Sequence, residues 1–165
     1  MFSRKKILIV VPILWLGFLL SISFMEAWLK FQAVGITQQI GLSIGKLIFG
    51  VLNKVELFFF LVIAIVAFSQ QHQMNKKIKR NVLLLLGTVL FLQTFYLLPI
   101  LDGRADMIIN GEEPAVSYFH FYYVALEVLK VILLINVINK VLLENESSKT
   151  IYDLDTDPKI DVNNT

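Results

Sequence analysis

The chain has no cysteine among its 165 residues, and only 17% of its residues are charged. The absence of cysteine excludes disulfides, iron–sulfur clusters and thiolate metal sites. The low share of charge argues against a soluble domain, because 56% of the residues are hydrophobic and so few polar groups could not cover that apolar surface. The net charge of +2 does not indicate a nucleic-acid partner. These absences predict an integral membrane protein whose first partner is the lipid bilayer.

Four apolar runs are long enough to cross a hydrocarbon core, which takes about 20 helical residues. They are too continuously apolar for barrel strands, which alternate and span in about 10 residues. Only a helix would then satisfy its own backbone in lipid. We predict an all-α, polytopic four-helix membrane bundle with spans at residues 7–25, 47–68, 82–101 and 118–143. Residues 1–143 would form this one domain, and residues 144–165 a disordered polar cytoplasmic tail.

Positive charge is unevenly distributed over the segments between the spans. Ten Lys and Arg residues lie near the N-terminus, between spans two and three, and after span four, against three in the two opposite connections. By the positive-inside rule both termini are cytoplasmic, in the plasma membrane (the inner membrane, for a bacterium). The alternative is a cleaved signal peptide, with basic residues 4–6 and small residues at 21–23. Cleavage would leave three spans and an external N-terminus.

The two outer connections differ in composition. Residues 26–46 are apolar for a solvated loop, and their Trp28 and Phe31 suit the headgroup region. We expect a partly buried or interfacial first outer loop, either a short helix lying in the interface or a dip into the bundle. Residues 102–115 are acidic and contain two glycines and a proline, which predicts an exposed turn.

The fourth span carries polar residues on one face. Steps of three and four place His120, Tyr123, Glu127 and Lys130 on a single stripe, which should face the bundle interior. With Tyr118 at the outer boundary, Glu127 lies about 14 Å deep, near the middle of a core of about 30 Å.

A second acid is predicted at the same depth. Asn53 and Glu56 share a face of the second span, and Glu56 lies about 15 Å below Lys46, whereas Lys54 projects away from it. Two carboxyl groups on different helices therefore reach a similar level. In the third span, Gln93, Tyr96 and Pro99 are expected to share a face. The outer half of the bundle collects Glu26, Lys30, Asn53, Glu56, Gln93, Asp102, Arg104, His120 and Glu127.

We interpret this outer cluster as the site of a small transport or ligand-binding protein. Glu56 and Glu127 would accept protons or a cation, and His120, Lys130 and Arg104 would tune or gate them. A charge at mid-bilayer costs at least ~2.5 kcal/mol, and such residues commonly mark ion or substrate paths. The further ligand- or proton-binding candidates are Asn53, Glu26 and Tyr123.

Two alternatives assign the polar residues a structural role. Polar residues inside a bundle also serve as interhelical contacts worth about 1 kcal/mol or less each, and Glu127 and Lys130 could pair within their own helix. The protein could also be a non-catalytic assembly or scaffold subunit, whose polar face binds a second copy of the chain or another membrane protein.

Metal and catalytic chemistry have less support. A divalent metal on His120 would need Glu56, Glu26 or Glu127 as further ligands, and His72 lies on the opposite side, too far to share a haem with His120. The chain has no H-E-x-x-H, no G-x-S-x-G and no phosphate loop. We therefore predict a protein that is not an enzyme and carries no cofactor, with an intramembrane metal or haem protein as the third interpretation.

Three stretches carry a family resemblance: LKFQAVGITQQIGLSIGKLIFG after the first span, LPILDGRAD after the third and FHFYYV at the start of the fourth. Over residues 7–143 the chain resembles the small four-helix proteins similar to transmembrane protein 205. The matching positions are Pro99 followed by Arg104, and His120. The resemblance implies the four-span fold and the membrane setting, and it implies no defined reaction.

Overall fold

The computed structural model describes residues 4–69 and 76–155, without the side chains of residues 4, 5, 69, 76–79 and 144–155. Within these ranges all regular structure is helical, with no strand. Four helical stretches are long and apolar enough to cross a membrane, namely Lys6–Gln32, Gln38–Phe68, Arg80–Ile109 and Phe119–Leu143. This is the architecture of a multi-pass membrane protein, and it confirms the all-α prediction with four candidate spans.

Two of the four stretches change helix type along their length. The first consists of α1 (Arg4–Leu19), the π-helix η1 (Leu20–Glu26), α2 (Ala27–Leu29) and the 3₁₀ turn η2 (Lys30–Gln32). The second is α3 (Gln38–Ser69). The third consists of α4 (Lys76–Leu92), the π-helix η3 (Gln93–Leu97) and α5 (Leu98–Ile109), and the fourth is α6 (Phe119–Asp155).

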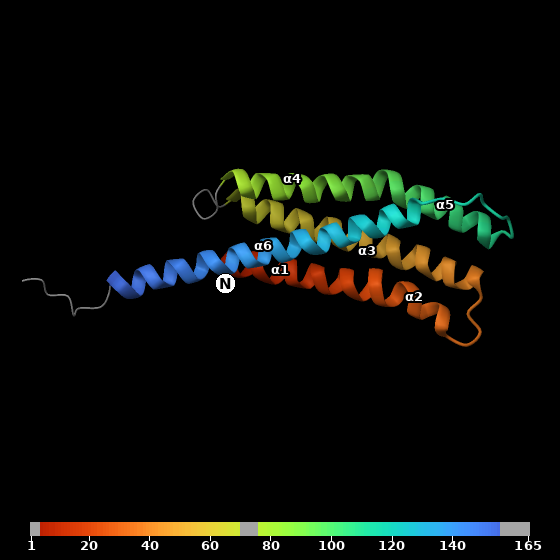
Figure 1. The fold of residues 1–165 in the computed structure, drawn as a ribbon, viewed down its shortest axis with the longest axis horizontal. Coiled ribbons are helices and arrows are strands. Elements are labelled where there is room, and N and C mark those ends of the chain that lie inside the picture. Colours follow the sequence, from red (N-terminus) through yellow and green to blue (C-terminus); the bar gives the residue numbers. More distant parts are fainter. Residues whose placement is uncertain (1–3, 70–75, 156–165) are drawn as a thin grey trace, which may run out of the picture.

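The stretches run up and down beside one another (Figure 1). α1 packs against α3 and α6, and α4 packs against the same two helices. The start of α1, the end of α3 and the far end of α6 lie at one end of the bundle, which we call the basic end because Lys6 and Arg80 lie there. The connections 33–37 and 110–118 lie at the opposite end, which we call the loop end.

Short, well-formed turns make these two connections. Thr37 caps α3, because its Oγ1 accepts a hydrogen bond from the backbone N–H of Ile40 at 3.3 Å. Gly111 follows α5 with a positive φ of 83°, and the backbone N–H of Glu112 donates to the carbonyl of Met107 at 2.9 Å. This is the Schellman ending that glycine favours, and it stops α5 sharply.

The helices extend beyond the predicted spans at the loop end. Where an interfacial loop is predicted at residues 26–46, the structure prolongs the first and second helices, so that only residues 33–37 connect them. α5 likewise takes up residues 102–109 of the predicted exposed turn. The physical reason is contact between the two prolonged helices: Phe31 lies against Gly41, and such packing overrides a loop-like composition.

The fourth helix also extends beyond its predicted end. α6 continues to Asp155 as a single helix, where a disordered tail is predicted from residue 144. Residues 156–165 of that predicted tail lie outside the described residues, as does the basic loop at residues 70–75. Since a helix started by a long packed span adds each further residue at little cost, polar residues can continue it.

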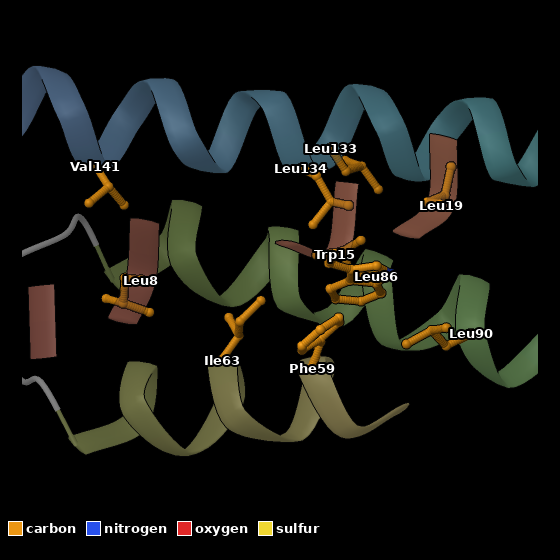
Figure 2. Close-up of a cluster of buried hydrophobic side chains, with 10 residues drawn as sticks. All are labelled: Leu8, Trp15, Leu19, Phe59, Ile63, Leu86, Leu90, Leu133, Leu134 and Val141. Carbon is orange, nitrogen blue, oxygen red and sulfur yellow. The ribbon is translucent and has the colours of Figure 1, made fainter. Parts of the chain in front are cut away.

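Apolar side chains form a continuous core toward the basic end (Figure 2). Trp15 and Leu134 are fully buried there, and Leu86 and Leu90 are almost so. The outward faces of the helices are also apolar, with Phe58, for example, 61% exposed. An apolar exterior around an apolar core is expected of helices that face lipid.

Candidate functional site

Two acidic side chains and one basic side chain meet in the middle of the bundle. The ammonium nitrogen of Lys130 in α6 lies 2.5 Å from Oε1 of Glu56 in α3 and 2.9 Å from Oε1 of Glu127, one turn earlier in α6. All three side chains are at most 1% exposed. We call Glu56, Lys130 and Glu127 the ion triad. Lys130 therefore pairs both with its own helix and across the bundle, and the two acids lie at one level.

Donors from the other two stretches complete the triad. The indole Nε1 of Trp15 donates to Glu56 Oε1 at 2.9 Å, and the amide Nε2 of Gln93 donates to Glu127 Oε1 at 2.9 Å. The hydroxyl of Ser23 donates to Glu127 Oε2 at 3.2 Å. Thus all four helical stretches contribute to one buried polar network, in which charge-assisted hydrogen bonds are the strong contacts.

The two π-helical segments carry two of these three donors, Ser23 and Gln93. Ser23 and Glu26 belong to η1, and η3 begins at Gln93. A π turn holds one more residue than an α turn, so it rotates the residues that follow it, and such turns often occur at functional sites. Gln93 at the start of η3 is buried, whereas Tyr96 and Pro99 are exposed. The predicted common face of these three residues is therefore wrong.

The triad is unbalanced in charge and incompletely hydrogen-bonded. Two carboxyl groups face a single ammonium group, so the fully ionised triad carries one excess negative charge in a buried place. Glu56 Oε2, Gln93 Oε1 and the hydroxyl of Tyr123 are buried without a hydrogen-bond partner among the described residues. Burying an unpaired charge or polar group is costly, which makes this network a place where a further proton, cation or water is stabilised.

A cavity of about 500 Å³ lies above the triad, toward the loop end. All four helical stretches form its walls, which are mostly apolar and rich in aromatic rings. Its lining residues are Ser23, Phe24, Ala27, Trp28, Lys30, Phe31, Gly41, Leu42, Gly45, Lys46, Phe49, Leu98, Leu101, Asp102, Ala105, His120 and Tyr123. Such a volume and lining are typical of pockets that hold small organic ligands.

The cavity and the triad share residues. Ser23 lines the cavity and donates a hydrogen bond to Glu127. Tyr123 also lines the cavity, is 3% exposed, and lies one turn before Glu127 on α6. The cavity floor therefore adjoins the buried charges.

Two ion pairs border the cavity. Lys30 lies 3.3 Å from Glu26, which is one turn earlier, and Lys46 lies 2.6 Å from Asp106. Glycine allows this packing on α3, because a Cβ at Gly45 would lie 2.8 Å from the Lys30 ammonium. Gly41 and Gly45 of α3 thus receive side chains of the first helical stretch, in line with the close helix approach that small residues permit.

The predicted site residues fall into different places. Glu56, Glu127 and Lys130 form the triad, and Tyr123 lies between it and the cavity. Asn53 is buried one turn before Glu56, but its amide donates to Thr94 Oγ1 at 2.9 Å and not to the triad.

Three further predicted residues lie apart from the triad. His120 is exposed at the cavity wall, although it shares the α6 stripe with Tyr123, because it lies in the first turn of α6 where no helix covers it. Arg104 donates to the backbone carbonyl of Ala115 at 2.5 Å and holds the connection after α5. Glu26 is part-buried beside Lys30 at the cavity border.

Sequence reasoning missed two members of the network. Trp15 reads as one more apolar residue of the first span, and Ser23 as a small residue near a signal-peptide-like site. Their partners, Glu56 and Glu127, lie far away in sequence. One sequence signal could have found them. A buried carboxylate needs hydrogen-bond donors, and only a few side chains with an N–H or O–H group lie at its depth in the other spans.

The donor set does not favour a metal centre in the part of the chain that the structure describes. No three His, Asp, Glu or Cys side chains converge there as metal ligands. His120, the nitrogen ligand in the metal interpretation, is exposed, and within the described ranges it forms no hydrogen bond or ion pair with Glu56, Glu26 or Glu127. His72, considered for haem, lies outside the described residues.

No family model matches the chain, and no curated protein or solved structure was found to be similar to it. The resemblance to the proteins similar to transmembrane protein 205 therefore stays a prediction.

Proposed function

We propose that this protein is a small transport or ligand-binding protein of the plasma membrane. The cavity takes up a ligand from the outer side, and the ion triad below it holds an exchangeable proton. The observation that carries the proposal is the junction between cavity and triad: Ser23 lines the cavity and donates to Glu127. A group bound in the cavity would therefore act on the buried charges through one side chain.

Charge balance supports the exchangeable proton. With Glu56 and Glu127 both ionised, the triad holds one excess negative charge at 0–1% exposure. A proton on one carboxyl group makes the triad neutral, which removes the cost of a buried net charge. The unpartnered oxygens of Glu56 and Tyr123 leave room in the network for that proton to change places.

The sidedness follows from the two ends of the bundle. The Lys and Arg excess at the basic end favours the cytoplasmic side for both termini, so the cavity opens outward. Toward the basic end, Leu134, Leu86 and Phe59 close the bundle below the triad (Figure 2). In this conformation the triad exchanges with the outer side alone.

The first test is the reactivity of the carboxyl groups. Dicyclohexylcarbodiimide modifies protonated carboxyl groups in apolar surroundings, and mass spectrometry locates the adduct. We expect labelling at Glu56 or Glu127 of the purified full chain at neutral pH. Glu113, which is exposed in the connection after α5, serves as the internal control and should not react. Labelling at neither triad acid in folded protein would end the proton-holding proposal.

The second test separates transport from binding. Proteoliposomes loaded with a pH-sensitive dye report proton flux, which should fall to the protein-free level for Glu56→Gln and Glu127→Gln. Glu113→Gln is the matched control and should keep the wild-type flux. If the folded variants at Glu56 and Glu127 keep that flux as well, the triad does not carry protons. Background flux in the wild type, with labelled triad acids, assigns the protein to ligand binding alone.

One exposed charge favours a second candidate function, an assembly subunit. Lys54 lies on an outward stripe of α3 between Val51 and Phe58, which are 58% and 61% exposed. A lysine on a lipid-facing stripe is stabilised by an acidic group of a neighbouring helix or by reaching the headgroups. Native mass spectrometry of the wild type and Lys54→Leu tests this: loss of a co-purifying chain in the variant supports assembly, and a monomer in both argues against it.

A further inference from the structure

The cavity walls are suited to a positively charged apolar ligand. Five aromatic side chains from the first helical stretch, α3 and α6 line it, and the face of an aromatic ring attracts a cation. The structure contains an example of this contact. The ammonium nitrogen of Lys30 lies 5.4 Å from the ring centroids of both Phe31 and Phe49. The five aromatic residues are Phe24, Trp28, Phe31, Phe49 and Tyr123.

The charge around the cavity is negative in balance. Five carboxyl groups line the cavity, pair with a lining residue or belong to the triad, whereas three ammonium groups do so. A proton on the triad removes one of the two excess negative charges and leaves the other. The carboxyl groups are Glu26, Glu56, Asp102, Asp106 and Glu127, and the ammonium groups are Lys30, Lys46 and Lys130.

Asp102 is the lining carboxylate that has no ion pair. It projects from α5 into the cavity wall and forms no salt bridge or hydrogen bond among the described side chains. Lys46, which also lines the cavity, is bound by both oxygens of Asp106 at 2.6 and 2.7 Å. Lys30 is likewise held by Glu26. No ammonium group of the described residues therefore pairs with Asp102, which leaves its carboxyl group available to a cationic group that enters the cavity.

The floor adds a buried polar group. The hydroxyl of Tyr123 lines the cavity close to Glu127, and no contact with a described residue meets hydrogen-bond geometry. It can accept a hydrogen bond from an N–H of a ligand or from ligand-bound water. An inorganic ion would leave most of the apolar wall uncovered, because pockets of this volume fit molecules the size of a drug.

We propose that the cavity binds a lipophilic organic cation, with its charged group beside Asp102 and its apolar body against the aromatic walls. This names the ligand class of the proposed function and rests on the cavity being its binding site. The basic side chains of the cavity do not oppose such a ligand, because each is neutralised by its own carboxylate.

Two probes of equal shape and opposite charge test the ligand class. Tetraphenylphosphonium is a lipophilic cation, and tetraphenylborate is its anionic counterpart. Titration of the purified full chain in a neutral detergent should show saturable binding of the phosphonium above that of empty micelles. The borate should bind at least about tenfold more weakly, the ratio that corresponds to one modest charge contact. Equal or tighter binding of the borate, or binding of neither probe, would overturn the ligand class.

Substitutions locate the site. Asp102→Asn should weaken phosphonium binding about tenfold, and Asp102→Glu should restore most of it. Glu113→Gln removes an exposed acid from the same end of the molecule but outside the cavity, so it should bind as the wild type does. Equal affinities for Asp102→Asn and Glu113→Gln would remove Asp102 from the site and overturn the proposal.

Tryptophan fluorescence reports where the phosphonium binds. The chain has two tryptophans: Trp28 lines the cavity, and Trp15 is fully buried in the core. Bound phosphonium should change the emission of the wild type, and Trp28→Phe should lose that change while it retains the Trp15 emission. A change that persists in Trp28→Phe would place the ligand elsewhere. These results are independent of carbodiimide labelling, so a wrong ligand class and a triad without a proton are distinguishable.

Discussion

The two halves of the bundle differ in what they bury. Toward the basic end the core is a set of apolar side chains, with a residual void of about 30 Å³. Toward the loop end the buried residues include two acids, a lysine, an asparagine and a glutamine, and a cavity of about 500 Å³. We call these the closed half and the cavity half. Trp15 lies at their border, because its ring packs in the closed half while its N–H binds Glu56.

This difference shows how the bundle accommodates costly groups. Charged side chains are buried where π-helical segments bring donors toward them, and the apolar half is regular α-helix. The closed half gives the fold its packing, and the cavity half leaves space and unpartnered oxygens. Packing without gaps maximises contact energy, so a large cavity beside buried charge lowers the packing of this half, which supports the function proposed for it.

The largest effect is expected at Lys130. Lys130→Met leaves Glu56 and Glu127 buried together without a cation, which should lower the free energy of unfolding by about 3–5 kcal/mol. The midpoint of denaturation in detergent measures this loss. The variant that also carries Glu56→Gln and Glu127→Gln should regain most of the stability, since no unpaired charge remains. A triple variant as unstable as Lys130→Met would show that Lys130 acts through packing.

Leu134 probes the closed half. Leu134→Ala removes a fully buried side chain from the apolar core and should cost about 2 kcal/mol. This is the lower end of the range for soluble cores, because the separated helices stay in lipid and lose packing only. The same denaturation midpoint measures it, and phosphonium binding in the cavity half should be unchanged. Weakened binding in Leu134→Ala would show that the two halves are coupled.

Gly41 probes the cavity half. A Cβ at Gly41 would clash with the ring of Phe31, so Gly41→Ala should displace that ring and cost about 1–3 kcal/mol. Gly17→Ala is the matched control, because no atom lies within 4 Å of a Cβ placed there, and it should be neutral or stabilising. Phosphonium affinity and Trp28 emission should change for Gly41→Ala alone. Equal behaviour of the two variants would contradict the packing of Phe31 on α3.

The smallest effect is expected at Arg104. Arg104→Gln loses a hydrogen bond to the carbonyl of Ala115 in an exposed place, which is worth about 0.5–1.5 kcal/mol. Hydrogen exchange should quicken in residues 110–118 and stay unchanged around the triad. Altered exchange at Glu127 would give Arg104 the gating role that the sequence predicts for it.

Much of the fold followed from the sequence because membrane helices obey few rules. Length and apolarity identified the four spans, and helical periodicity placed Tyr123, Glu127 and Lys130 on one buried face. Counting residues from the span ends also placed Glu56 level with Glu127, and Lys130 contacts both. Cytoplasmic termini stay a prediction, since no membrane defines the sides of the molecule.

The parts that failed depend on contacts between distant residues. The interfacial loop is instead two helix ends, because Phe31 and Lys30 pack on Gly41 and Gly45. His120 has the right periodicity but lies in the first turn of α6, where no other helix covers it. A π turn cannot be read from regular periodicity. The prediction therefore placed Tyr96 on the same face as Gln93, whereas Gln93 is buried and Tyr96 is exposed.

Composition and spacing were enough to establish a helical bundle with two acids and a lysine at one depth, because length, polarity and the helical repeat are local properties. The tertiary structure decided that Lys130 joins both acids, that Trp15, Gln93 and Ser23 donate to them, and that a cavity lies directly above. These features depend on how four helices pack side by side, and packing is set by shape and partner geometry across the whole bundle.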